Sequence, residues 1–263
     1  MDMLRALWAY RGFVLSAIRN DFKTRFAQSK LGVLWMIIHP LMQVLIFATI
    51  LSEVLSAKLP GVQNKFGYAL YLMAGILFWT LFVESVTRTV SLFIDNGNLM
   101  KKVAFPRICL PFIAAGTLLA NNLLLLAAIF LVFAFLGHFP SAASLWLPAL
   151  MLLTLGLSMS IGVLLGVFNV FMRDIGQVVP VVLQALFWLT PIVYSVEILP
   201  AEVREAFKLN PLLPLVTAYH DVLLYERVPD WVSLVPLMIA TALLGMLALV
   251  VFRRAGQEMV DAL

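Results

Sequence analysis

Residues 96–111 form the stretch of this chain best equipped to engage another molecule. Their sequence, NGNLMKKVAFPRICLP, places the cations Lys101, Lys102 and Arg107 between two long apolar runs. Basic residues alone would be expected in any cytosolic loop between membrane spans. A docking surface also needs apolar anchors, and this segment embeds three: Leu99, Phe105 and Pro106.

Enzymatic chemistry has little support in the sequence. The chain contains no G-x-x-x-x-G-K-[ST] loop for nucleotide phosphates, no H-E-x-x-H motif and no G-x-S-x-G motif. Its three histidines lie far apart, and its only cysteine, Cys109, cannot form an intrachain disulfide. We therefore expect no catalytic or metal site and no nucleotide site in this chain, which leaves transport or a membrane scaffold as its function.

The composition is that of an integral membrane protein. Of 263 residues, 63% are hydrophobic and 12% are charged, with a mean hydropathy of +1.01, whereas soluble domains are about half apolar and a quarter charged. The net charge of +4 comes from basic residues beside apolar runs, as topology and anionic lipid headgroups favour. We expect membrane lipids as partners and no nucleic acid.

The apolar runs predict six membrane-spanning helices. They cover about 30 Å of hydrocarbon each and lie approximately at residues 31–55, 68–93, 108–136, 145–171, 176–196 and 231–252. Residues 1–30 mix basic residues with apolar ones that mostly recur at helical spacing, which predicts an amphipathic helix in the membrane interface. Residues 197–230 predict short re-entrant helices. The whole chain, 1–263, is expected to form one all-α polytopic membrane domain.

Polar and small residues inside the spans predict helix contacts. Asn121 and Asn122 fall near the middle of the third expected span and need hydrogen-bond partners on another helix. Ser158, Gly162 and Gly166 repeat at four-residue spacing in the fourth, which predicts close approach of a neighbouring helix. The pattern is common in membrane helices and does not by itself indicate a dimer interface.

Charged residues predict one ion pair and the orientation of the chain. Glu84 and Arg88, at i and i+4 of the second expected span, can neutralise each other near its end. Twelve of the 18 Lys and Arg residues fall on the cytosolic side when both termini are placed there, against five in the outer loops. This asymmetry predicts cytoplasmic termini.

In chain order, the sequence resembles the membrane subunits of bacterial polysaccharide-exporting ABC transporters, the O-antigen and capsule type of the ABC-2 permease family. Almost the whole chain takes part in the resemblance. It is carried by Asp21-Phe22-Lys23 with Ser29-Lys30-Leu31-Gly32 and Trp35 leading to Pro40; Asn98-Leu99, Lys101-Lys102 and Phe105-Pro106-Arg107 ahead of Leu110-Pro111; Arg173-Asp174 before Trp188, Thr190-Pro191 and Tyr194; and Asn210-Pro211.

The resemblance implies a homodimer of six-span subunits joined to two ATP-binding cassette subunits. ATP and Mg²⁺ would be bound by those partners, so this chain would bind no cofactor itself. The complex would export a lipid-linked polysaccharide, such as O-antigen or capsule, across the bacterial inner membrane. Residues 197–230 would form a re-entrant periplasmic gate, and the first and fifth spans would line a lateral opening for the lipid anchor.

The resemblance also implies the site residues. Those expected to couple the chain to the ATPase are Asn96, Asn98, Leu99, Lys101, Lys102, Phe105, Pro106, Arg107, Arg173 and Asp174. A conduit for sugars is suited by aromatic rings, which offer many weak contacts to flat C–H faces. The conduit candidates are Trp35, Phe78, Trp79, Phe82, Phe187, Trp188 and Tyr194. For each, the alternative is core packing or an interfacial aromatic belt.

Three other functions stay open on the sequence alone. The first is an ABC permease that exports teichoic acid or a drug. The second is an ion-coupled secondary carrier, which the scarcity of acidic residues in the spans and the lack of a clear inverted repeat disfavour. The third is a membrane scaffold that transports nothing, which would tolerate replacement of the conduit aromatics.

Overall fold

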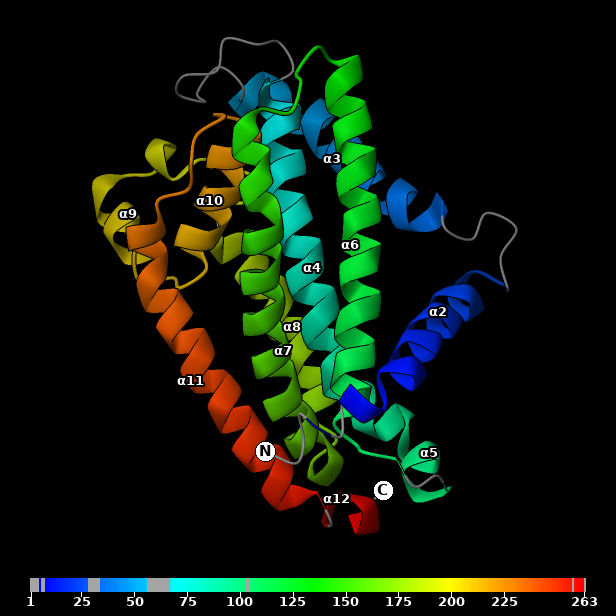
Figure 1. The fold of residues 1–263 in the computed structure, drawn as a ribbon. Helices are drawn as coiled ribbons and strands as arrows, with labels where there is room; N and C mark the ends of the chain where they lie inside the picture. Colours follow the sequence, from blue (N-terminus) through cyan, green and yellow to red (C-terminus); the bar gives the residue numbers. More distant parts are fainter. Residues whose placement is uncertain are drawn as a thin grey trace.

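The computed structural model describes residues 5, 8–27, 34–55, 67–102, 105–256 and 258–262, and all regular elements among them are helices (Figure 1). The all-α prediction is confirmed. The α-helices are α2 (Arg11–Ala27), α3 (Leu34–Leu55), α4 (Gly67–Asp95), α5 (Gly97–Lys102), α6 (Cys109–Phe135), α7 (Leu147–Phe171), α8 (Ile175–Leu189), α9 (Ala201–Phe207), α10 (Leu213–Leu223), α11 (Trp231–Ala255) and α12 (Glu258–Ala262), with 3-10 turns η2 (Ala142–Trp146) and η3 (Val196–Ile198).

Four of the described helices are long and apolar enough to cross a membrane: α4, α6, the continuous η2–α7 and α11. This makes the chain a multi-pass membrane protein. Helix α3 has 22 residues, with its described apolar stretch at Ile37–Ile46, and α8 has only 15. The count of six spans stays a prediction. Residues 28–33 and 56–66, which include the predicted start of the first span, lie outside the described chain.

Helix α8 is shorter than the expected fifth span, and the cause lies at its end. Thr190 has extended backbone angles, φ −106° and ψ 130°, as favoured for a residue that precedes proline. Pro191 therefore ends the helix at Leu189. The chain then enters a non-helical segment before η3.

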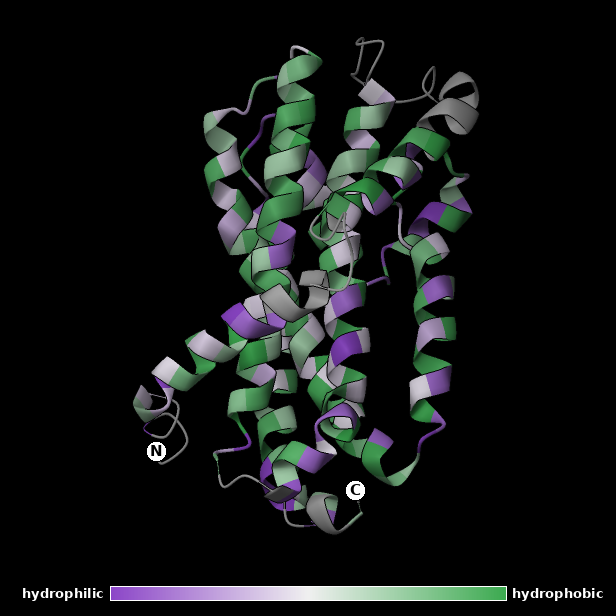
Figure 2. Ribbon diagram, turned by 90° about the vertical axis from the view of Figure 1, so that its right-hand side faces the viewer, coloured by the Kyte–Doolittle hydropathy of each residue, from purple (hydrophilic) through white to green (hydrophobic). Residues whose placement is uncertain are grey.

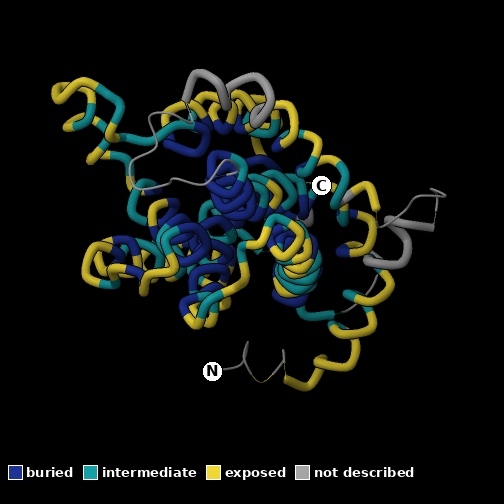
Figure 3. Tube along the Cα trace, turned by 90° about the horizontal axis from the view of Figure 1, so that it is seen from above, coloured by how far each residue is buried: buried dark blue, intermediate teal, exposed yellow. Residues whose placement is uncertain are grey.

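Helix α4 is the centre of the bundle. It contacts α3, α6, α7, α8 and α10, and seen from above the buried trace gathers around the middle of the molecule (Figure 3). Of the most apolar stretch of α4, 72% is buried, against 17% for α11. Hydrophobic residues cover the long helices on their outer sides as well (Figure 2), which is expected where the solvent is lipid.

The small-residue ridge of α7 packs against α4. A Cβ atom added at Gly162 would lie 2.8 Å from Cβ of Thr89, and one added at Gly166 would lie 2.6 Å from the Thr89 carbonyl oxygen. Ser158, the third member, is buried and hydrogen-bonds within its own helix, to the Thr154 carbonyl at 2.8 Å. The predicted close helix approach is confirmed, and it occurs within this chain.

Asparagine in the third expected span also joins helices. The Asn122 side chain donates a hydrogen bond to the Leu77 carbonyl of α4 at 3.1 Å, and Asn121 beside it is buried. A polar side chain inside an apolar bundle gains most from a partner on another helix. The predicted use of this amide is confirmed.

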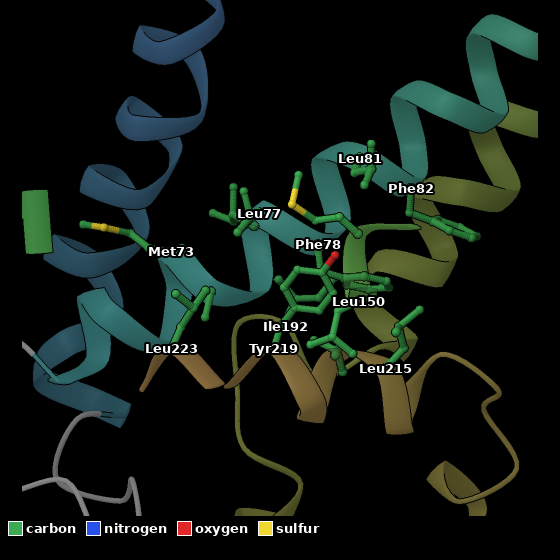
Figure 4. Close-up of a cluster of buried hydrophobic side chains, with 14 of the residues drawn as sticks. Met73, Leu77, Phe78, Leu81, Phe82, Leu150, Ile192, Leu215, Tyr219 and Leu223 are labelled. Carbon is green, nitrogen blue, oxygen red and sulfur yellow. The ribbon is translucent and has the colours of Figure 1, made fainter. Parts of the chain in front are cut away.

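Helix α10 lies against α4 and α7 through a cluster of buried side chains (Figure 4). Tyr219 is fully buried, with its ring 5.6 Å from that of Phe78 and its hydroxyl 3.1 Å from Thr154 Oγ1. Leu150 and Leu215 complete the contact and are themselves fully buried. A short helix in the expected re-entrant region is thus part of the main core.

Helix α2 lies along the lower part of α6 (Figure 1). Its half-buried residues Val14, Ala17, Ile18 and Asp21 follow helical spacing and form one face. The Cδ1 end of Ile18 lies so close to Gly116 that it would have to shift to make room for a Cβ atom there. Other apolar residues of α2, such as the exposed Leu15, lie off this face, so the helix presents apolar groups to its surroundings as well as to α6.

The partner that the structure shows for Arg88 is Asp21. The two side chains form an ion pair between α4 and α2, in which Arg88 is 18% exposed and Asp21 is 28% exposed. The sequence pattern had suggested Glu84, which lies one turn away and is exposed. Asp21 is 67 residues from Arg88 in the chain, so only the folded arrangement brings the two together.

Candidate coupling surface and conduit residues

Helix α5 projects from the lower end of the bundle, between α4 and α6 in the chain (Figure 1). Asn96 starts it: its backbone carbonyl accepts from the Met100 amide at 3.0 Å, and its side chain donates to the Leu92 carbonyl at 2.8 Å. Met100 turns inward and is 6% exposed, in a small core with Leu92 and Phe93. One apolar residue and one amide thus attach the start of α5 to the end of α4.

The outer part of α5 has two exposed polar residues and one leucine that is only partly covered, since Leu99 also lines a pocket with residues of α2, α4 and α6. Asn98 and Lys101 are exposed, and Leu99 is 37% exposed. An exposed leucine between an amide and a cation forms a small surface with an apolar centre and a polar rim, as in protein interfaces. The side chain of Lys102 lies outside the described part of the chain.

The rest of the predicted coupling segment turns toward the protein. The Phe105 ring lies 5.7 Å from that of Phe13 on α2. Arg107 donates a hydrogen bond to the Gly256 carbonyl just after α11. Phe105, Pro106 and Arg107 are all half-buried, so they fix the base of α5 and leave Asn98, Leu99 and Lys101 at its tip as the outward residues.

Helix α12 completes this end of the molecule. It contacts both α5 and α7, and its Met259 is fully buried in the same small core as Met100. The C-terminal segment therefore braces α5 from behind. The sequence analysis predicted no helix here, since five residues are too few to show a pattern.

Arg173 and Asp174 lie exposed in the tight turn between α7 and α8. This turn is ordered by Asn169, which sequence reasoning missed. Its side chain donates to the Val90 carbonyl of α4 at 3.0 Å and accepts from the Gly176 amide at 2.9 Å. The signal was present as a lone amide in the apolar run GVFNVF, near enough to a turn to serve as its anchor.

The conduit candidates separate into two groups. Phe78 and Phe82 are buried in the core, at 0% and 3% exposure. Trp79, Phe187 and Trp188 line a pocket of about 370 Å³ between α3, α4 and α8 together with Gln43 and Gln184, and of these three rings Phe187 is also buried, at 8% exposure. Within it, the ring centroid of Phe187 lies 5.5 Å from that of Trp79 and 5.4 Å from that of Trp188.

The remaining two candidates, Trp35 and Tyr194, lie on different segments of the chain. Trp35, near the start of α3, is 54% exposed, as is Trp188. Tyr194 is half-buried beyond α8, where its hydroxyl donates to the Trp188 carbonyl. An aromatic row with amides beside it can accept a sugar through ring faces and hydrogen bonds, and Trp79, Phe187 and Trp188 form that row.

The segment after α8 is held by tyrosines that sequence reasoning also missed. The Tyr68 hydroxyl donates to the Val193 carbonyl at 2.8 Å, and the Tyr71 hydroxyl lies 3.0 Å from the carbonyl of Pro191 and 2.8 Å from that of Tyr194. Phenols of α4 thus satisfy backbone groups that no helix pairs. Irregular backbone that is buried, as at Ile192 and Val193, requires partners of this kind.

A buried histidine adds to this attachment. His220 of α10 stacks on Tyr71, with ring centroids 3.8 Å apart and 12° between the planes. Asn210 ties the end of α8 to the start of α10, because its side chain donates to the Leu189 carbonyl at 2.9 Å and accepts from the Leu212 amide at 2.9 Å. Residues 190–194 and α10 are therefore packed against α4.

The long apolar helices define the class of protein to which this chain belongs. It is a multi-pass helical membrane protein, and its described residues contain no group of three His, Cys, Asp or Glu side chains able to hold a metal. Comparison with known proteins gives the family. The sequence profile of ABC-2 type transporters matches residues 13–224, and the chain belongs to that family.

Two kinds of relative resemble this chain along nearly its whole length. O-antigen export system permease protein RfbA of Myxococcus xanthus is 26% identical over 263 residues, or 99% of each chain, and that of Klebsiella pneumoniae is 27% identical over 95% of each. Polysialic acid transport protein KpsM of Escherichia coli is 21% identical over 92% of this chain and 93% of its own. The predicted family is confirmed.

Proposed function

We propose that this chain is the membrane subunit of an ATP-driven exporter that moves lipid-linked polysaccharide, of the O-antigen or capsule kind, across the bacterial inner membrane. The observation that carries the proposal is the similarity to O-antigen permeases over 99% of both chains. A second copy of this chain and two ATP-binding cassette subunits complete the transporter, and both termini lie in the cytoplasm.

The tip of α5 is the contact with the ATPase in this proposal. Leu99 supplies the apolar anchor and Lys101 the polar rim, both accessible. The inward residues Met100 and Phe105 connect the tip to α4 and α2. Because this base is packed, a displacement of the tip when the ATPase closes is passed to the spanning helices and is not absorbed locally.

The pocket between α3, α4 and α8 supplies sugar contacts. Trp79, Phe187 and Trp188 line it with aromatic rings, and the side chain of Gln184 has both a donor and an acceptor. A polymer that must slide needs many weak contacts and no deep site. Phe78 and Phe82 support this row from the core, since Phe82 lies 5.8 Å from Trp79 and 6.1 Å from Phe78.

Export measured in proteoliposomes tests the cargo. The chain is reconstituted with its ATPase and supplied with lipid-linked O-antigen, and polysaccharide that crosses the bilayer is measured with ATP hydrolysis. Trp188→Ala should lower export severalfold while the complex assembles normally. The matched control is Trp146→Ala, which is also exposed but lies at η2, away from the pocket.

Two results would overturn the proposal. One is export by the Trp188→Ala variant equal to that of the Trp146→Ala variant, which would remove the conduit role of the pocket. The other is ATP-independent movement of the polysaccharide driven by an ion gradient, which would remove the ABC mechanism.

A further inference from the structure

A long apolar groove runs over the face of the bundle formed by α6, α7 and α11. A pocket of about 380 Å³ lies between these three helices, and one of about 680 Å³ lies between α2, α6 and α7. The two share Phe112, Ala115 and Leu155 as lining residues, so they form one continuous groove. Each is in the size range of small-molecule sites.

The groove is lined almost wholly by apolar side chains. Its one hydroxyl, Ser160, hydrogen-bonds to the Gly156 carbonyl at 2.6 Å and is satisfied within α7. Water has nothing to bind there, while an empty groove would forfeit dispersion contacts along its walls. A flexible hydrocarbon chain is the occupant whose chemistry matches.

One end of the groove carries a positive charge. Arg11, the first residue of α2, and Trp8, three residues before it, line the larger pocket. The Arg11 guanidinium lies 5.2 Å from the Trp8 ring centre and donates one hydrogen bond to the Trp8 carbonyl at 3.0 Å. A guanidinium has five N–H donors in a planar fork that suits phosphate, so most of this fork faces outward from an exposed residue.

We propose that the groove binds one anionic glycerophospholipid of the bilayer leaflet at the α5 end, with its phosphate on Arg11 and an acyl chain along Phe112, Ala115 and Leu155. The charge at the rim, the apolar lining and the exposed tryptophan, a residue typical of the headgroup level, occur in the order that such a lipid presents them. In this proposal the lipid is a structural one that fills the space between α2 and the spanning helices α6 and α7.

The groove is separate from the proposed conduit. The conduit pocket is lined by α3, α4 and α8, and the groove by α2, α6, α7 and α11, with no residue in common. In Figure 1, α6 and α7 lie in front of α4, with α11 beside them, while α3 and α8 lie behind. The proposal therefore commits to a bilayer phospholipid and does not depend on the cargo of the transporter.

The test measures lipid retained by the whole chain. The protein is incorporated in nanodiscs made from phosphatidylglycerol and phosphatidylethanolamine in equal amounts, extracted in mild detergent, and examined by native mass spectrometry. One retained phosphatidylglycerol per chain is expected. Arg11→Gln should lower that occupancy about fivefold, since one basic side chain near a membrane surface contributes about 1 kcal/mol to anionic lipid binding.

Two matched controls separate the site from general effects. Arg19→Gln removes a cation from the same helix at an exposed position that lines neither pocket, and it should leave the occupancy unchanged. Ala115→Leu should block the groove where its two parts join and displace the lipid. Ala127→Leu adds the same volume on an exposed face of the same helix and should not.

Three outcomes would overturn the proposal. The first is equal retention by the Arg11→Gln and Arg19→Gln variants, and the second is unchanged retention by the Ala115→Leu variant. The third concerns protein taken from its native membrane. If the molecule lost from the Arg11→Gln variant there is a polyprenyl phosphate, the groove serves the transported lipid anchor and is no structural phospholipid site.

Discussion

The side-chain amide of Asn169 joins α7 to α4 by a hydrogen bond of 3.0 Å to the Val90 carbonyl. Its oxygen accepts from the Gly176 amide at 2.9 Å, at the start of α8. One buried residue thus fixes three helices where the exposed turn at Arg173 and Asp174 leaves the bundle. The position of that turn relative to α4 depends on this contact.

Replacing Asn169 with alanine is expected to loosen this junction. The change leaves the Gly176 amide and the Val90 carbonyl without their side-chain partner, which costs about 1–3 kcal/mol when the groups are buried. The midpoint of thermal unfolding in detergent should fall by several degrees. Asn98→Ala is the control, because Asn98 is exposed on α5, and a similar fall in both variants would contradict the assignment.

The glycine ridge of α7 predicts a contrast between two alanine substitutions. Gly166→Ala places a Cβ atom 2.6 Å from the Thr89 carbonyl oxygen, a backbone atom that cannot move alone. Overpacking of this kind costs about 1–3 kcal/mol. Gly156→Ala meets only Thr241 Cγ2 at 3.4 Å and should be nearly neutral. Unfolding in detergent measures both, and equal stability of the two variants would refute the close contact between α7 and α4.

The tyrosines of α4 predict how firmly residues 190–194 are held. Tyr71→Phe removes the hydroxyl that lies between the carbonyls of Pro191 and Tyr194, while the ring that stacks on His220 remains. Loss of such a bond costs about 1 kcal/mol, so amide hydrogen exchange at 190–199 should become about fivefold faster. Tyr10→Phe, at an exposed site, is the control. Unchanged exchange in the Tyr71→Phe variant would show that packing alone holds the segment.

Much of the fold could be predicted from sequence because the membrane imposes simple rules. Long apolar runs must form helices whose backbone is satisfied internally, so α4, α6, α7 and α11 appear where the runs do. The small-residue ridge at Gly162 and Gly166 and the amide of Asn122 also carried reliable signals. Each of these residue types has one dominant use inside a bundle.

Contacts between distant segments could not be predicted in the same way. Arg88 had a carboxylate one helical turn away, yet it pairs with Asp21 of α2. Phe105 and Arg107 were expected on the outer coupling surface, and the structure shows them packed against Phe13 and Gly256. A periodic pattern describes one helix, whereas these partners depend on how several helices pack, which no local spacing encodes.

The aromatic residues illustrate the same limit. Phe78 and Trp79 are adjacent in sequence and of similar character, but they point to different sides of α4. Phe78 is fully buried beside Tyr219, and Trp79 lines the pocket with Phe187. The sequence predicts that both aromatic residues lie in the helix bundle. Only the packing shows which ring is buried in the core and which lines the pocket.

Site-specific crosslinking at Leu99 tests most directly the claim that α5 is the contact with the ATPase. Leu99→Cys is made in a Cys109→Ala background, reconstituted with the ATPase and treated with a short reagent that reacts with a thiol at one end and with lysine amines at the other. Leu209→Cys is the control, since Leu209 is 85% exposed but lies beyond α9, away from α5. We predict a covalent adduct with the ATPase from position 99 and none from position 209. An adduct from position 209, or none from position 99 in an assembled and active complex, would contradict the account.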